Sequence, residues 1–282
     1  MKNRGDEYFK ATTLVFALSI PLLLFALFVS LLHSSIPAIS RYGLGFLFSV
    51  SWNPVTESYG ALPFIYGTLV SSILALLIAG PLGLGCAIFL SESLPFPNFI
   101  KSVVSRMVEL LAAIPSIVYG LWGIFVLGPV IGLNMLTASI ILSIMILPTI
   151  TVVSREVMDA VPNNLRESAI AMGATKWEMI KLAIIGPAKS GIIGAIILGL
   201  GRALGETMAV TMVIGNRPEI SLSPFAPSYT LASVIANEFA EAVSEMSVSV
   251  LVELALILLI ITMIVNAVAR YLVWKTSNKA HI

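Results

Sequence analysis

Long runs of apolar residues separated by short polar segments dominate the chain. A helix that crosses a lipid bilayer needs about 20 mostly apolar residues. The runs predict six membrane-spanning helices, at residues 12–32, 67–90, 110–127, 133–153, 191–214 and 248–273. The first run is too long for a cleavable signal peptide, and no small-residue cleavage site follows it. The predicted fold class is an all-α polytopic membrane protein.

Prolines interrupt three of the predicted spans, at Pro81, Pro115 and Pro148. Each removes one backbone donor and tends to kink its helix. Such irregularity is tolerated in a membrane where neighbouring helices or a water-filled cavity satisfy the freed carbonyls. Glycines and alanines are frequent around these prolines, which favours close packing between helices.

The composition agrees with a membrane protein. The 282 residues are 58% hydrophobic and only 11% charged, whereas soluble domains are about one quarter charged. A net charge of +1 argues against a nucleic-acid binder. Cys86 is the one cysteine, and His33 and His281 have no partners at ligand spacing. We therefore expect no disulfide framework, no metal and no cofactor.

The distribution of lysines and arginines predicts an orientation. If both termini are cytoplasmic, thirteen of these residues face the cytosol and two, Arg41 and Arg217, face outside. The remaining one, Arg202, falls within a predicted span. Because positive charge is retained on the cytoplasmic side, we expect a multi-pass protein of the cell membrane with both termini inside.

Two long segments, at about 32–66 and 215–247, face outside in this orientation. The second carries four acidic residues against one arginine: Glu219, Glu238, Glu241 and Glu245. Connections of this length usually have a function or are disordered. Two interpretations remain open, a solvated acidic loop and a docking surface for an external partner.

The segment between the fourth and fifth predicted spans reads as two short helices joined at Gly173. Asn164 and Glu167 predict a cap for the first helix, and Thr175 and Glu178 predict a capping box for the second. Gly173 occupies a position where a left-handed C-terminal cap is expected.

Three apolar residues of this segment, Leu165, Ala169 and Met172, recur at helical spacing and predict a small apolar face suited to a groove. The run Glu167-Ser168-Ala169, followed after three residues by Gly173, resembles the EAA-xxx-G signature of permease subunits of ABC importers. Ser168 departs from that signature, and so does Gly186, which precedes Pro187 at the closing proline position.

The resemblance implies that loop 161–187 is the coupling element that docks into a cleft on a cytoplasmic ATPase. It implies a coupling role for a set of five residues: Leu165, Glu167, Ala169, Met172 and Gly173.

Further strings narrow the resemblance to the C-type permease of phosphate-specific (Pst) importers. They are Trp52-Asn53-Pro54 and the segments 59–68, 113–120, 199–209 and 236–241. The resemblance implies a type I permease fold in three parts. Residues 1–63 would form the N-terminal helix and first external loop, 64–273 the permease core, and 274–282 a cytoplasmic tail.

The same resemblance implies the partners. They are an A-type permease subunit in a heterodimer, a cytoplasmic ABC ATPase dimer, an external phosphate-binding protein, phosphate and membrane lipid, with no nucleic acid.

Arg202 and Glu206 are the candidate residues of the substrate pathway. An arginine near the bilayer centre costs about 2.5–3.5 kcal/mol on insertion scales, so it needs polar surroundings. Four residues apart in one span, the two would share a helix face. A guanidinium suits a tetrahedral oxyanion, and Glu206 would compete for it and allow release. The alternative is an ion pair that joins two spans. Glu253, at a similar expected depth in the sixth span, is a third candidate.

Sequence signatures of enzymes are missing: the chain has no P-loop string, no Gly-x-Ser-x-Gly elbow and no His-Glu-x-x-His pair. We expect a non-enzymatic transporter subunit with ATP hydrolysis on a partner chain. The alternatives are a permease for sulfate or molybdate and an ion-driven secondary transporter, although the latter would contain inverted repeats that this sequence lacks. An intramembrane enzyme would need catalytic residues that we do not find.

Overall fold

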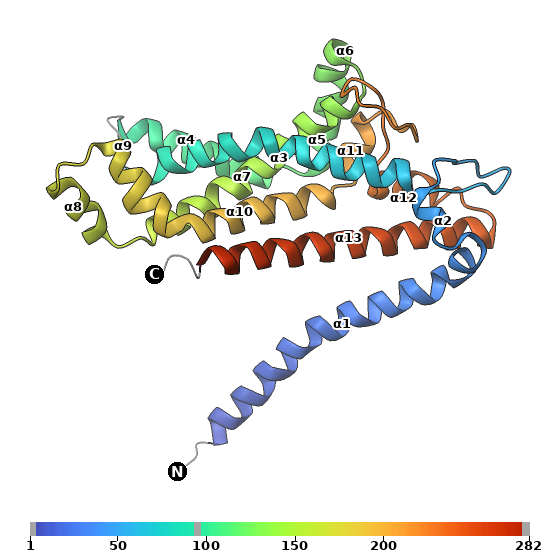
Figure 1. Cartoon of the computed structure of the whole chain (residues 1–282), viewed down its shortest axis with the longest axis horizontal. Coiled ribbons are helices and arrows are strands. Elements are labelled where there is room, and N and C mark those ends of the chain that lie inside the picture. The colour runs from blue at the N-terminus through green and yellow to red at the C-terminus, as the bar shows by residue number, and fades with distance from the viewer. Residues whose placement is uncertain (1–3, 93–96, 278–282) are drawn as a thin grey trace.

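The computed structural model describes residues 4–92 and 97–277, which are almost entirely helical (Figure 1). Within those ranges, β pairing is limited to isolated bridges between Asn53 and Ser58 and between Gly215 and Ser228. The longer helices are α1 (Arg4–Tyr42), α3 (Leu62–Ser91), α4 (Asn98–Ala113), α7 (Met135–Asp159), α10 (Gly186–Leu204) and α13 (Glu245–Ser277). The shorter elements are α2 (Gly45–Phe48), α5 (Ser116–Trp122), the π-helix η1 (Gly123–Leu127), α6 (Gly128–Ile131), α8 (Asn163–Ala171), α9 (Lys176–Met179), the π-helix η2 (Ile180–Ile185), α11 (Met208–Val213) and α12 (Leu231–Glu238).

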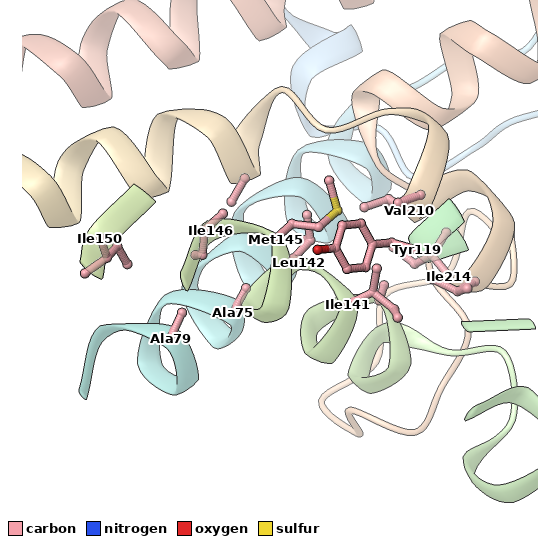
Figure 2. Close-up of a cluster of buried hydrophobic side chains, with 14 residues drawn as sticks. Ala75, Ala79, Tyr119, Ile141, Leu142, Met145, Ile146, Ile150, Val210 and Ile214 are labelled. Carbon is pink, nitrogen blue, oxygen red and sulfur yellow. The ribbon is translucent and has the colours of Figure 1, made fainter. Parts of the chain in front are cut away.

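Helix α7 is at the centre of the bundle and packs against α3, α4, α10 and α11. Its start is set by Asn134, whose side-chain oxygen accepts a hydrogen bond from the Thr137 N–H at 2.9 Å. Ile141, Ile146 and Ile150 of α7 are fully buried in the main core cluster. In Figure 2 this cluster follows α7, with alanines of α3 on one side and Tyr119 beside Val210. Small alanines on α3 let the two helices approach closely.

Two further apolar clusters lie at the ends of the bundle. One joins α2, α12 and the start of α13, and the other joins the last turns of α3 and α7 to α9 and η2. We call these ends the α12 end and the α8 end. The first described turn of α1 and the last of α13 both point toward the α8 end (Figure 1).

The structure confirms the predicted all-α polytopic class. Five helices are long and apolar enough to cross a membrane, and the count is six if the bent pair Asn98–Ala113 and Ser116–Ile131 forms one span. The predicted third span, 110–127, is therefore not one rod: the chain bends by 98° there. Ile114 has an extended backbone (ψ 128°), because the residue before a proline avoids helical geometry. Helices α3 and α7, in contrast, continue through Pro81 and Pro148.

The predicted bounds of the fifth span, 191–214, are wrong at both ends. Helix starts at Lys176 and runs through η2 to Leu204 without interruption. It starts early because the Thr175–Glu178 capping box, which the sequence predicted, leads directly into the span. It ends early at Gly205, where the chain turns before α11.

Both long outer segments contain more helix than expected. Helix α1 continues to Tyr42 rather than ending near residue 32, and α12 lies within the segment 215–247. Helix α1 is joined to α13 near the α12 end, where Ser249 Oγ accepts from the Ala38 N–H at 3.1 Å and donates to the Ser34 carbonyl at 2.9 Å. Toward the α8 end α1 separates from the bundle (Figure 1).

The predicted tail 274–282 is described only as far as Ser277, within α13. Residues 278–282, Lys279 among them, lie outside the described residues, and so does Lys2.

Gly67 of α3 provides a test of the packing at the α12 end. A Cβ there would collide with the Tyr229 carbonyl oxygen and would meet Ser228 Oγ at 2.8 Å. That backbone is held in place, because the Leu231 N–H donates to Thr68 Oγ1 at 2.9 Å. We expect Gly67→Ala to lower the free energy of unfolding by about 1–3 kcal/mol, seen as a lower melting temperature in detergent.

The matched control is Gly80→Ala on the same helix, where an added Cβ meets no atom within 4 Å. This variant should melt at or slightly above the wild-type temperature, because alanine favours helix. Equal melting temperatures for the two variants would contradict the packing described for Gly67.

Candidate functional site

The break between α10 and α11 separates Arg202 from Glu206. Arg202 is in the last turn of α10, and Glu206 follows the C-cap Gly205. Glu206 Oε1 accepts a hydrogen bond from the Ala209 N–H at 3.2 Å, so the carboxylate caps the start of α11. No ion pair joins Arg202 to Glu206 in the described chain. The expectation that the two share one helix face is wrong, because the helix ends between them.

Arg202 has an exposed side chain. Within the described ranges no protein group accepts a hydrogen bond from its guanidinium, which interacts electrostatically with Tyr119 of α5. Around it, a Cβ at Gly201 or Gly205 would meet only atoms at 3.8 Å or beyond, whereas one at Gly199 would meet Ile150 Cγ1 at 2.9 Å. Gly199 is therefore needed for packing, and Gly201 and Gly205 leave space beside an arginine with free donors.

Helices α5 and α11, which follow the two breaks in the spans, pack against each other. Gly120 allows this approach, since a Cβ there would meet Met212 Sδ at 2.6 Å and Ala209 Cα at 3.2 Å. Tyr119 donates its hydroxyl hydrogen to the Leu111 carbonyl at 2.8 Å. That carbonyl is in the last turn of α4, where helical partners are missing. At each break, a side chain thus satisfies one of the backbone groups that would otherwise lack a partner in a membrane.

Glu253 does not lie at the level of Arg202. The nearest atom to a Cβ on Gly201 would be Asn266 Oδ1, at 3.9 Å. Glu253 precedes Asn266 by 13 residues on α13, or about 20 Å along a helix axis. Its side chain is buried, and no described group donates a hydrogen bond to Oε2. The expected equal depth is wrong, and Glu253 belongs to the half of α13 nearer the α12 end.

The loop of α8 and α9 has the two-helix form that the sequence predicts. Gly173 has a left-handed backbone (φ +86°). The Gly173 N–H donates to the Ile170 carbonyl at 2.9 Å and the Ala174 N–H to the Ala169 carbonyl at 3.1 Å, which is a Schellman ending for α8. The predicted cap at Asn164 is wrong, because Pro162 occupies the N-cap position and α8 has no side-chain cap.

The coupling residues expected from the resemblance differ in exposure. Leu165 and Met172 are 41% and 85% exposed, and Glu167 is exposed as well. Ala169 is half-buried against the apolar cluster of the α8 end. The sequence analysis missed two exposed apolar side chains beside them, Ile170 and Trp177. Their signal was present as large apolar residues in a short polar loop. Helices α8 and α9, on which they lie, are at the extreme α8 end of the bundle (Figure 1).

The α12 end contains a cavity of about 510 Å³ between the segment after α2 and the segment after α12. Trp52 Nε1 donates to both carboxylate oxygens of Glu238, at 3.0 and 3.1 Å. The Trp52 ring also contacts Tyr59 and Phe64 edge to face. Glu238 is therefore bound within the protein rather than free in an acidic loop, while Glu241 and Glu245 are exposed. Sequence spacing gave no indication of the contact between residues 52 and 238.

Within the described ranges, no three His, Cys, Asp or Glu side chains are grouped so that they could hold a metal ion. The candidate functional features are therefore the unpaired Arg202, the buried Glu253, the α8–α9 loop at one end and the cavity at the other.

Comparison with known proteins gives consistent matches over most of the chain. Residues 79–278 match the family model described as the binding-protein-dependent transport system inner membrane component. A Mesorhizobium japonicum protein named phosphate transport system permease protein PstC is 46% identical, over 96% of this chain and 90% of the relative. A Pasteurella multocida protein of the same name is 43% identical, over 96% and 92%.

Solved structures match in fold. A chain of the MetNI methionine ABC transporter in an inward-facing conformation aligns with a TM-score of 0.64 at 16% identity, over 80% of this chain and 99% of that one. A bacterial ABC transporter involved in alginate import aligns with a TM-score of 0.62 at 17% identity, over 95% and 99%.

The environment of Glu238 predicts a pH dependence. Removal from water raises the pKa of the Glu238 carboxyl, the Trp52 hydrogen bond partly opposes this, and Glu241 adds to the rise. The folded protein keeps this proton at pH values where an unfolded chain, with a pKa of about 4.3, has lost it. The retained proton on Glu238 therefore stabilises the folded protein below the pKa of the unfolded chain. This stabilisation is lost as the pH rises through the raised pKa of the folded protein.

We expect the melting temperature of Glu238→Gln to depend less on pH than that of the wild type across this window. The control is Glu219→Gln, a carboxyl in the same outer segment that is exposed. The two variants should differ in the slope of melting temperature against pH. Equal slopes in both variants would rule out a buried, proton-retaining Glu238.

Proposed function

Because the chain belongs to the family of binding-protein-dependent transport system inner membrane components, we propose that it is a permease subunit of an ATP-driven phosphate importer. The observation that carries the proposal is the 46% identity, over 96% of the chain, with a protein named as a phosphate permease. The chain supplies helices for half of a translocation pathway, and a similar A-type subunit supplies the other half.

In this proposal Arg202 binds phosphate within the pathway. Its guanidinium has free donors in a planar fork, which suits two oxygens of a tetrahedral oxyanion. The glycines Gly201 and Gly205 beside it leave room for a ligand to approach the backbone. Because α5 and α11 both border this position, a relative movement of the two short helices would open or close the space around the arginine.

Glu206 and Glu253 have separate roles in the proposal. Glu206 follows Arg202 closely in sequence and caps α11. If α11 moves, the carboxylate is released from the cap and competes with phosphate for the guanidinium. Glu253 lines the pathway nearer the α12 end, as its buried carboxyl without a donor on Oε2 suggests.

At the α8 end, the proposed partner is a cytoplasmic ABC ATPase dimer. A contact surface formed by four exposed apolar side chains, Leu165, Ile170, Met172 and Trp177, would enter a cleft on that ATPase. Glu167 adds a charged contact at its edge, and Gly173 sets the turn between the two helices. Ala169 supports the loop from beneath rather than touching the partner. ATP hydrolysis takes place on the partner chain.

At the α12 end, the proposed partner is an external phosphate-binding protein. The cavity between Trp52 and Glu241 and the exposed Glu245 would form part of its docking surface. This assignment sets the orientation: the α8 end and both termini are cytoplasmic, in a cell membrane. It agrees with the excess of lysines and arginines in the segments that face the α8 end.

The function is tested with a purified complex of this chain, the A-type permease and the ATPase in lipid. We expect its ATP hydrolysis to rise when phosphate-loaded binding protein is added, but not when sulfate- or molybdate-binding protein is added instead. Stimulation by one of the latter proteins alone would replace phosphate with another oxyanion. No association with an ATPase would contradict the proposal.

Arg202→Ala tests the pathway residue. We expect phosphate flux into proteoliposomes to fall about tenfold or more at equal amounts of assembled complex, because charge-assisted hydrogen bonds worth about 1.5–3 kcal/mol are lost. Arg202→Lys should retain intermediate flux, since it keeps the charge without the fork. The control Arg270→Ala removes an exposed arginine from α13 and should transport normally. Near-normal flux in Arg202→Ala would remove the residue from the pathway.

Gly173→Val tests the coupling loop. Valine in the left-handed conformation costs about 1–2 kcal/mol, so α8 should lose its Schellman ending. We expect phosphate-stimulated ATP hydrolysis to be abolished while the protein still inserts in the membrane. Gly194→Val on α10, where an added Cβ meets no atom within 4 Å, is the control and should couple normally. Normal coupling in Gly173→Val would show that ATPase coupling does not depend on this turn.

A further inference from the structure

A polar cluster at the α8 end connects the loop of α8 and α9 to the ends of two membrane-spanning helices. At its centre Arg166 of α8 forms an ion pair with Glu92, the C-cap residue of α3, with Nη2 and Oε1 3.3 Å apart. The side chains are only 17% and 6% exposed. The resemblance singled out neither residue, and the proposed pathway uses neither.

The guanidinium of Arg166 also joins α8 to the end of α7. Nη2 donates to the Met158 carbonyl at 2.9 Å, and Nη1 donates to the Val161 carbonyl. Met158 is in the last turn of α7 and is fully buried. A cation is favourable at this position, because carbonyls at a helix C-terminus have no helical partners and carry partial negative charge.

Glu92 needs this cation more than an ordinary surface carboxylate does. It is buried, and it stands at the C-terminus of α3, where negative charge is unfavourable. Removing one partner of a buried pair leaves an uncompensated charge, which is strongly destabilising. The carbonyl of Glu92 also accepts a hydrogen bond from Lys101 of α4, so α4 is attached at the same point.

The polar cluster shares Met158 and Val161 with an apolar cluster at the same end. Ala87 of α3 and Val161 after α7 pack with Met179 and Ile184 of the segment that follows the loop. Helix α8 itself packs against α9 and η2. Arg166 therefore supplies the polar side-chain contacts from α8 to the ends of α3 and α7, and α8 cannot be displaced without moving those ends or breaking the ion pair.

We propose that the Arg166–Glu92 ion pair is the connection that transmits movement of the α8–α9 loop to α3 and α7. This inference rests on the proposed function and makes Arg166 and Glu92 positioning residues for coupling. When the ion pair is intact, a displacement of the α8–α9 loop also displaces the ends of α3 and α7. When it is broken, the ATPase displaces the loop but the two membrane-spanning helices stay in place.

The test measures phosphate transported per ATP hydrolysed in proteoliposomes that contain the full complex. We expect Glu92→Gln and Arg166→Gln each to lower this ratio about tenfold, within the range of coupling between distant sites. The double variant should be no worse than either single variant, because all three lack the same connection. Arg155→Gln is the control: it removes an exposed ion pair to Asp159, 3.4 Å long, and a hydrogen bond to Ser105 of α4 at the same end, and it should keep the wild-type ratio.

Arg166→Lys provides the conservative comparison. It keeps the charge but cannot hold Glu92 and two carbonyls at once, so the ratio should lie between those of Arg166→Gln and the wild type. It replaces Arg166→Gln if that variant fails to assemble.

A wild-type ratio in Glu92→Gln, or in Arg166→Lys where the neutral variants do not assemble, would overturn the inference. Absence of ATP-dependent phosphate transport in the wild-type complex would instead contradict the proposed function, so the two failures are distinguishable.

Discussion

The contact between α5 and α11 is the feature on which the rest of the structure depends. Each helix follows an interruption of a membrane-spanning helix, one at Ile114–Pro115 and the other at Gly205. Each interruption would leave backbone groups without hydrogen-bond partners in a membrane. The hydroxyl of Tyr119 satisfies the Leu111 carbonyl. The Glu206 carboxylate satisfies the Ala209 N–H. The two irregular segments are thus stabilised by specific side chains and by each other.

This arrangement explains why Arg202 is free. In an unbroken helix Glu206 would lie one turn further along the same face and would pair with the arginine. Because the helix is interrupted, the Glu206 carboxylate caps α11 instead. The Arg202 guanidinium is left with free donors beside Tyr119. An unpaired arginine at the end of a membrane-spanning helix is costly. In the proposed function, phosphate supplies the negative charge that Arg202 lacks.

The two ends of the bundle are built differently, as their proposed partners require. At the α8 end, the loop of α8 and α9 carries exposed apolar side chains, and a buried ion pair and an apolar cluster connect it to α3 and α7. At the α12 end, aromatic rings and the Trp52–Glu238 hydrogen bonds hold the outer segments around a cavity. The central helix α7 extends between the two regions and packs on both α10 and α11.

Much of the fold follows from local sequence signals. Apolar run length predicts the spans, and Thr175 with Glu178 predicts the start of a helix, because each depends on residues close together in the chain. The prolines predict a bend at Pro115, but the same signal at Pro81 and Pro148 does not end a helix. The break at Gly205 was missed, since the apolar residues continue through it and periodicity alone favours one long helix. Contacts between distant residues were also missed, as with Trp52–Glu238 and Arg166–Glu92. In these pairs a polar residue gains its role only from the tertiary packing that brings its partner near.

The most direct test of the account is phosphate accumulation by proteoliposomes that contain the assembled complex. ATP is supplied on the side of the α8–α9 loop and the binding protein on the other side, with excess sulfate or molybdate as competitor. The account predicts accumulation of phosphate that requires ATP and that neither competitor reduces. Accumulation of sulfate or molybdate in place of phosphate, or phosphate uptake driven by an ion gradient without ATP, would contradict it.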